Sequence, residues 1–256
     1  MTTHEWVKDD DRSLGATAPP AAVLAGARRI RLWDLPLRAF HWSLVLAVTV
    51  AVVTGKLGGG WMNLHGKAGL CIVGLVVFRL VWGFVGSTHA RFASFFPTPG
   101  RVRAYLGGRW REVGHNPLGA LSVLALLALL ALQAGTGLFS NDDIAYTGPL
   151  YPSVSDALAQ RLSAIHRLSV NGLLALIGLH VLAIAYHVRI KRDDLLKPMV
   201  TGWKDVAQGE STHGGSPLAL AAAVLLAVLA ASSVGSSAAP GRTPVPAHVV
   251  ASKPAW

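Results

Sequence analysis

The sequence from residue 164 to residue 188 reads AIHRLSVNGLLALIGLHVLAIAYHV. It is apolar over enough residues to cross the hydrocarbon core of a membrane, which takes about 20 residues of helix. It also carries His166 and His180, which are 14 residues apart. At about 3.6 residues per turn the two imidazoles lie on nearly the same face, roughly 21 Å apart along the axis. Ionisable side chains are costly inside a membrane, so this pair indicates a function.

The composition is that of a membrane protein. Of the 256 residues, 52% are hydrophobic and only 14% are charged, which excludes an ordinary soluble domain. Four other stretches approach the length of a spanning helix, at residues 39–55, 66–86, 118–138 and 217–234. The sequence therefore predicts an all-α integral membrane bundle with a four-helix core and a fifth, C-terminal transmembrane helix. Asp34 before Pro36, and Asn116 before Pro117, predict two helix starts.

The net charge of +10 could indicate a nucleic-acid partner, so its distribution along the chain decides its meaning. Sixteen Lys and Arg residues lie in segments 1–38, 87–116 and 189–216, against five in the alternate segments 56–67, 139–165 and 235–256. This is the positive-inside pattern. It predicts a cytoplasmic N-terminus, a C-terminus outside and no nucleic-acid partner. Because Cys71 is the only cysteine, the sequence also excludes a covalently attached c-type haem.

Two more histidines, His41 and His65, begin apolar helices. With the N-terminus inside, His41 lies in the inner leaflet and His65 in the outer leaflet. The helix of His166 and His180 runs from outside to inside, so His166 is outer and His180 is inner. The depths therefore pair His41 with His180 and His65 with His166, and each pair could ligate one haem. The alternative for any one of them is a hydrogen bond to a neighbouring helix.

Other polar residues leave alternatives open. His187 lies about 10 Å beyond His180 and about 31 Å from His166, and neither separation suits two haems. We interpret it as an interfacial residue; the alternative is contact with a haem propionate or a quinone headgroup. Arg79 could extend to the membrane surface or pair with a propionate of the inner haem. His115 is expected to be a solvated loop residue.

Several motifs carry a family resemblance. They are Arg38-Ala39-Phe40-His41-Trp42 with Thr54-Gly55, His65 with Arg79 and Leu80-Val81-Trp82-Gly83, His166-Arg167-Leu168 with His180, Gly114-His115-Asn116-Pro117-Leu118-Gly119, and the segment from Asp194 to Gly202. Over residues 31–204 the chain resembles the bacterial cytochrome b561 and nickel-iron hydrogenase b-type cytochrome family. The fourth helix departs from the hydrogenase subunits, because it has Asn171 and Leu176 where they carry aromatic residues.

The resemblance implies a di-haem cytochrome b of the bacterial inner membrane. Two non-covalent b haems would be held by His41, His65, His166 and His180. Electrons would pass between the quinone pool and a redox partner, either a c-type cytochrome or a dehydrogenase. Two rival functions are a haem-free transporter that uses the histidines for protons, and a membrane anchor for a partner dehydrogenase.

Composition and the resemblance together suggest a division of the chain. We expect a disordered cytoplasmic arm at residues 1–30 and the di-haem transmembrane domain at residues 31–204. A linker with the fifth helix follows at residues 205–235, and a flexible tail at residues 236–256.

Overall fold

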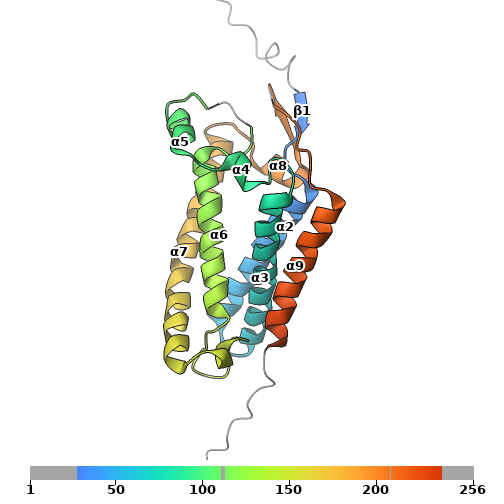
Figure 1. The fold of residues 1–256 in the computed structure, drawn as a ribbon. Helices are drawn as coiled ribbons and strands as arrows, with labels where there is room; N and C mark the ends of the chain where they lie inside the picture. Colours follow the sequence, from blue (N-terminus) through green and yellow to red (C-terminus); the bar gives the residue numbers. More distant parts are fainter. Residues whose placement is uncertain (1–27, 111–112, 208, 238–256) are drawn as a thin grey trace, which may run out of the picture.

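The computed structural model describes residues 28–110, 113–207 and 209–237. Within these ranges it contains five helices that are long and apolar enough to cross a membrane. They are α2 (Leu35–Leu57), α3 (Met62–Val85), α6 (Pro117–Gly137), α7 (Asp156–Arg189) and α9 (Pro217–Ser236). Successive helices run in opposite directions along the bundle (Figure 1). This confirms the predicted all-α membrane bundle.

The predicted helix starts are confirmed. The Asp34 side chain caps α2 by accepting a hydrogen bond from Leu37 N, and Pro36 lies in the first turn. Asn116 caps α6 in the same way, with the N–H of Gly119 as donor. These side chains satisfy amides that have no partner within the helix.

Helix α7 begins at Asp156, well before the apolar stretch that starts at residue 164. Ser155 caps it by accepting from Leu158 N. Its 34 residues rise about 51 Å, which exceeds the roughly 30 Å hydrocarbon core. The first two turns therefore extend the helix beyond the apolar span, and hydrophobicity alone could not reveal them.

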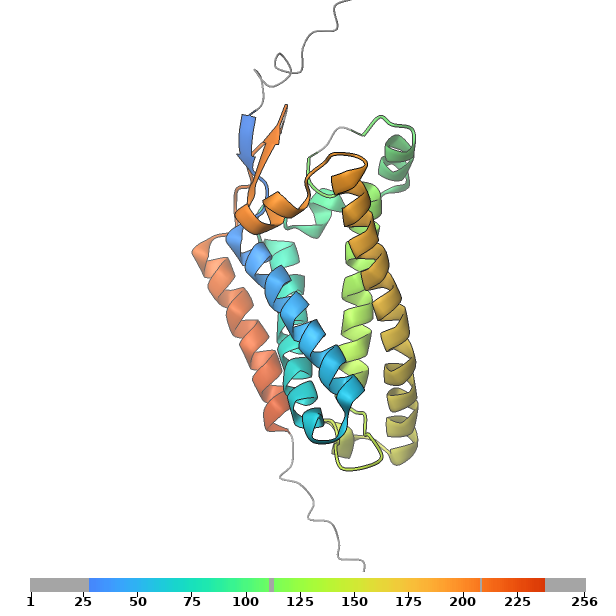
Figure 2. The ribbon, with the colours of Figure 1, turned by 180° about the vertical axis from the view of Figure 1, so that it is seen from behind.

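Helix α3 is the centre of the bundle. It packs against α2, α6 and α9, whereas α7 packs mainly against α6. Helix α9 lies on the side of α3 away from α6 and α7 (Figures 1 and 2). The approach of α9 is close, because a Cβ at Gly74 would lie 3.2 Å from the carbonyl oxygen of Ala227. Small residues allow such packing between membrane helices.

Shorter elements close the two ends of the bundle. At the end where α2 begins lie the antiparallel strands β1 (Arg28–Arg31) and β2 (Trp203–Val206), with helices α4 (Phe92–Phe95), α5 (Pro99–Leu106) and α8 (Leu196–Thr201). At the opposite end lie the 3₁₀ turns η1 (Gly59–Trp61) and η2 (Tyr151–Ser153). The two-stranded ribbon formed by β1 and β2 was not expected. Strand β1 begins inside the range predicted as a disordered arm, and β2 crosses the domain boundary expected at residue 204. Residues 1–27 and 238–256, most of the predicted arm and tail, lie outside the described residues.

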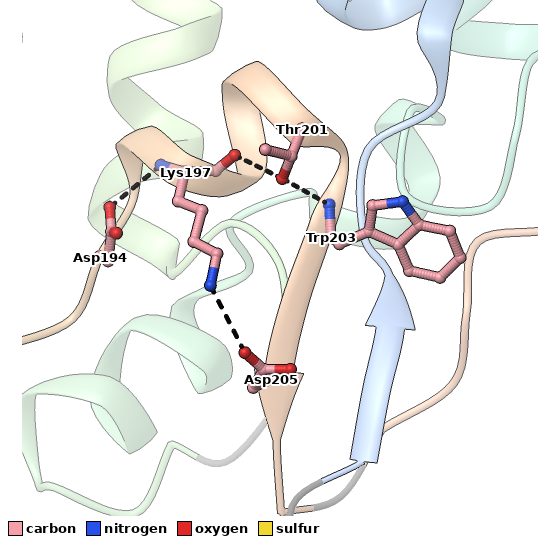
Figure 3. A network of polar contacts seen from close by, with 5 residues as sticks. All are labelled: Asp194, Lys197, Thr201, Trp203 and Asp205. Atoms are coloured by element: carbon pink, nitrogen blue, oxygen red, sulfur yellow. Dashed lines mark hydrogen bonds and ion pairs between the residues drawn. The ribbon is translucent and has the colours of Figure 1, made fainter.

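Polar contacts fix α8 to β2 (Figure 3). Asp194 accepts a hydrogen bond from Lys197 N, and Lys197 Nζ lies 3.7 Å from a carboxylate oxygen of Asp205. Thr201 Oγ1 donates to the carbonyl of Lys197 and accepts from Trp203 N. The ribbon and α8 therefore form one connected cap over this end of the bundle.

Asp34 joins the start of α2 to the end of α3. Its carboxylate is buried and accepts two hydrogen bonds, from Leu37 N at 2.7 Å and from Trp82 Nε1 at 3.0 Å. The Trp82 ring continues a stack with Phe78 and Phe40, whose successive centroids are 6.0 and 6.1 Å apart. One side chain thus combines a helix cap with a contact between helices.

Replacing Asp34 by Ala should destabilise the bundle by about 2–4 kcal/mol, because it removes a cap and leaves the buried Trp82 N–H without an acceptor. Denaturation of the purified protein in detergent measures this loss. Asp194→Ala is the matched control, because the exposed Asp194 carboxylate accepts hydrogen bonds from Leu196 N and Lys197 N at the start of α8, and its loss should cost at most about 1 kcal/mol. Equal midpoints for the two variants would contradict the role assigned to Asp34.

Candidate functional site

The structure brings His65 and His166 together. His65 lies in the first turn of α3 and His166 lies on α7, so two separate helices supply the pair. Their ring centroids are 6.0 Å apart and their planes are nearly perpendicular, at 87°. Both residues are half-buried. The depth argument from the sequence predicted this pairing.

We call His65 and His166 the outer pair, after the leaflet in which the sequence analysis expected them. Each imidazole of this pair is anchored through Nδ1. His65 Nδ1 lies 2.8 Å from the carbonyl oxygen of Ala51, and His166 Nδ1 lies 2.9 Å from that of Gln133. A carbonyl oxygen only accepts hydrogen bonds, so Nδ1 carries the proton in both rings and Nε2 carries the lone pair. Metal-binding histidines typically have this tautomer, held by a backbone carbonyl.

Glycines on neighbouring helices leave room for the two rings. A Cβ at Gly55 would lie 2.9 Å from Nδ1 of His65, and a Cβ at Gly137 would lie 2.9 Å from Cε1 of His166. Any larger residue would displace the imidazoles. Two glycines of α3 serve other contacts: Gly66 lies against Tyr146, and Gly74 lies against α9.

Gln133 belongs to this site, although the sequence analysis missed it. Its side-chain amide donates to the carbonyl of His166 at 3.1 Å, and its Oε1 accepts from Ser169 at 2.5 Å. The same amide nitrogen lies 3.3 Å from Nε2 of His166, so a metal at this atom would replace that contact. The available signal was a single amide in an otherwise apolar stretch of α6.

The inner pair, His41 on α2 and His180 on α7, is also close enough to interact electrostatically. His41 Nδ1 is buried and has no hydrogen-bond partner among the described residues. Residues on both sides of His41 bind α8: Arg38 donates to the carbonyl of Val200, and Trp42 Nε1 donates to that of Met199 at 3.2 Å. The cap over the bundle thus fixes the turn of α2 that carries His41.

His115 differs from its expected place in solvent. Its ring lies between Trp33 and Phe95, with centroids 4.7 Å away in each case, and its buried Nδ1 has no hydrogen-bond partner in the described part of the chain. Burial, with the neighbouring Arg79 charge, lowers the pKa of His115 to about 3. The contact between His115 and Trp33 joins residues that are far apart in the sequence, so local sequence does not encode it.

His187 lies in the last turn of α7 and is half-buried. Its carbonyl accepts from Asp193 N at 3.0 Å, and its ring contacts the adjacent Tyr186. The described residues therefore give no histidine partner to His187.

Comparison with known proteins identifies the family. The family model described as prokaryotic cytochrome b561 matches residues 32–202. A probable Ni/Fe-hydrogenase B-type cytochrome subunit of Azotobacter chroococcum mcd 1 is 26% identical over 218 residues, which is 68% of this chain and 88% of that protein. A probable Ni/Fe-hydrogenase B-type cytochrome subunit of Rhodobacter capsulatus is 22% identical over 216 residues, which is 68% of this chain and 80% of that protein. No solved structure matches the chain.

The matched region runs from before the start of α2 to the end of α8, and it contains all four histidines of the two pairs. Five apolar helices and this match together describe a multi-pass bacterial membrane protein. Cytochromes of this b type carry haem b and transfer electrons. The chain is therefore a membrane cytochrome b that belongs to the prokaryotic cytochrome b561 family.

Proposed function

We propose that the chain binds two non-covalent b haems and moves electrons between the quinone pool and a redox partner. One haem lies between His65 and His166, and the other lies between His41 and His180. The outer pair is the observation that carries the proposal, because its ring centroids are 6.0 Å apart. Two imidazoles that each make a metal–nitrogen bond of about 2 Å to one iron have ring centroids about 6 Å apart.

The residues around the outer pair fit a haem iron. The Nδ1 atoms are bonded to the carbonyls of Ala51 and Gln133, so each Nε2 can serve as a ligand. Gly55 and Gly137 give the rings space without a competing side chain. At the inner pair, the buried Nδ1 of His41 has no hydrogen-bond partner among the described residues, and a buried polar group without a partner is costly.

Each haem would be held by two histidines. Bound haem b would supply one-electron chemistry, and a second histidine on each iron would favour electron transfer over the binding of oxygen. The protein keeps the ligands oriented and excludes water with apolar helices. Because His166 and His180 are 14 residues apart on one helix, the two ligand levels are separated by roughly 21 Å along α7. The 31–204 segment is the di-haem unit, and 205–235 adds the linker and α9.

The partners are part of the proposal. Quinone is the exchangeable substrate, and the other partner is a c-type cytochrome or a dehydrogenase; the names of the relatives make a nickel-iron hydrogenase the first dehydrogenase to test. The loop between α6 and α7 offers a fixed negative charge at Asp142. Partial burial alone would raise the pKa of Asp142, but the N–H groups of Tyr146, Ile144 and Ala145 lower it overall. This carboxylate is ionised at pH 7 and can attract a basic partner surface.

We also propose that the N-terminus is cytoplasmic, so that His41 and His180 form the cytoplasmic pair. The support is the excess of basic residues in alternate segments. Fusion of an alkaline phosphatase reporter after residue 256 should give activity, because α9 would carry the C-terminus out of the cytoplasm. If only a reporter that works in the cytoplasm is active at this position, the C-terminus is cytoplasmic and the proposed orientation is contradicted.

The direct test of function is reduction by a quinol. The purified protein should show the absorption bands of low-spin b haem, and a water-soluble quinol analogue should reduce them. A spectrum without haem bands would support the transporter alternative. Bound haem that quinol does not reduce, while dithionite does, would support the membrane-anchor alternative.

A pair of glycine substitutions tests the outer site. Gly137→Ala should lower haem content from two per chain towards one, because the new Cβ would displace the His166 ring. Gly135→Ala changes the same helix in the same way, but a Cβ there would meet no described residue outside its own turn of helix within 4 Å, so both haems should remain. Haem per polypeptide is measured by pyridine haemochrome. Equal haem contents in the two variants would contradict the contact between Gly137 and a ligand.

A further inference from the structure

Arg79 is a buried cation that has no ion pair with any residue the structure describes. Its exposed fraction is 2%, although it lies on a membrane-spanning helix. The guanidinium lies 4.5 Å from the ring centroid of Phe92 and 5.9 Å from that of Phe95. Its Nη1 is buried and makes no hydrogen bond within the described part of the chain. The side chain therefore does not extend to the membrane surface, which was one of the two roles expected for it.

Asp34, an acidic residue near Arg79, does not neutralise the Arg79 charge by an ion pair. Asp34 attracts Arg79 electrostatically, but the two make no ion pair within 4 Å. The Asp34 oxygens already accept from Leu37 N and Trp82 Nε1. Burying a charge is costly unless it is paired and hydrogen-bonded. Arg79 thus requires a further anion.

The height of Arg79 along the bundle shows where that anion lies. Arg79 is 14 residues after His65 on α3, and His180 is 14 residues after His166 on α7. Helices α3 and α7 run in the same direction (Figure 1). Because His65 and His166 are in contact, equal rises of about 21 Å bring Arg79 to the level of His180.

His115 adds a second buried nitrogen that has no hydrogen-bond partner among residues 28–110, 113–207 and 209–237. Its electrostatic neighbours are Arg79, His89 and His180. Its lowered pKa makes the imidazole neutral at pH 7, so one ring nitrogen is free to donate a hydrogen bond without adding charge. The buried Nδ1 and the buried Nη1 of Arg79 are therefore complementary to one acceptor group.

We propose that Arg79 and His115 bind a propionate carboxylate of the inner haem, and that the Arg79 charge raises the reduction potential of that haem. This inference rests on the proposed binding of two haems. A guanidinium and a carboxylate are matched in charge and geometry. A nearby positive charge favours the more negative, reduced state of the iron.

Redox titration of the purified two-haem protein tests this inference. Arg79→Gln should move one of the two potentials downwards, by on the order of tenfold in the reduction equilibrium constant, which is about 59 mV for a one-electron couple. The other potential should stay unchanged. Arg79→Lys keeps the charge, so its potential should stay close to that of the wild-type protein. Arg167→Gln is the control, because it removes an exposed charge beside the outer ligand and should leave the inner potential unchanged.

If Arg79→Gln does not accumulate in the membrane, His115→Gln carries the test and should shift the same potential to a smaller extent. Two haems whose potentials are both insensitive to these changes would overturn the inference and would leave the proposed function intact. An equal shift of both potentials would also overturn it. A wild-type protein with fewer than two redox components would instead contradict the proposed function itself.

Discussion

Imidazoles inside an apolar bundle need partners, and the arrangement of the helices follows from that requirement. In hydrocarbon no water is available to satisfy a polar nitrogen. At the outer level the structure satisfies Nδ1 of His65 and His166 with backbone carbonyls, which leaves two Nε2 atoms for a metal. At the inner level Nδ1 of His41 has no such partner among the described residues. The two levels therefore differ in how much the protein alone provides.

The bundle divides these tasks among its helices. Helix α7 carries one histidine at each level, whereas α2 and α3 carry one each, so three helices hold the four histidines of the two proposed haem sites. Helix α6 carries none of these four histidines, but it holds His166 through Gln133 and makes room for it at Gly137. Helix α9 packs on the other side of α3, away from α7, and its small residues suit a supporting role.

Local sequence was sufficient to predict the helix starts at Asp34 and Asn116, because capping depends on adjacent residues. The pairing of depths was also predictable, since helix rise converts residue spacing into height. The ribbon between β1 and β2 was not, because it joins segments about 170 residues apart whose sequences have no clear alternation. His115 and Gln133 were missed for a related reason: their roles depend on which elements fold against them.

The central claim is that each haem depends on one histidine of α7. Haem content per chain in His166→Ala and His180→Ala measures this most directly, with His187→Ala as the control on the same helix. The account predicts one haem in each of the first two variants and two haems in the third. Two haems in the His180→Ala protein, with a loss in the His187→Ala protein, would contradict it.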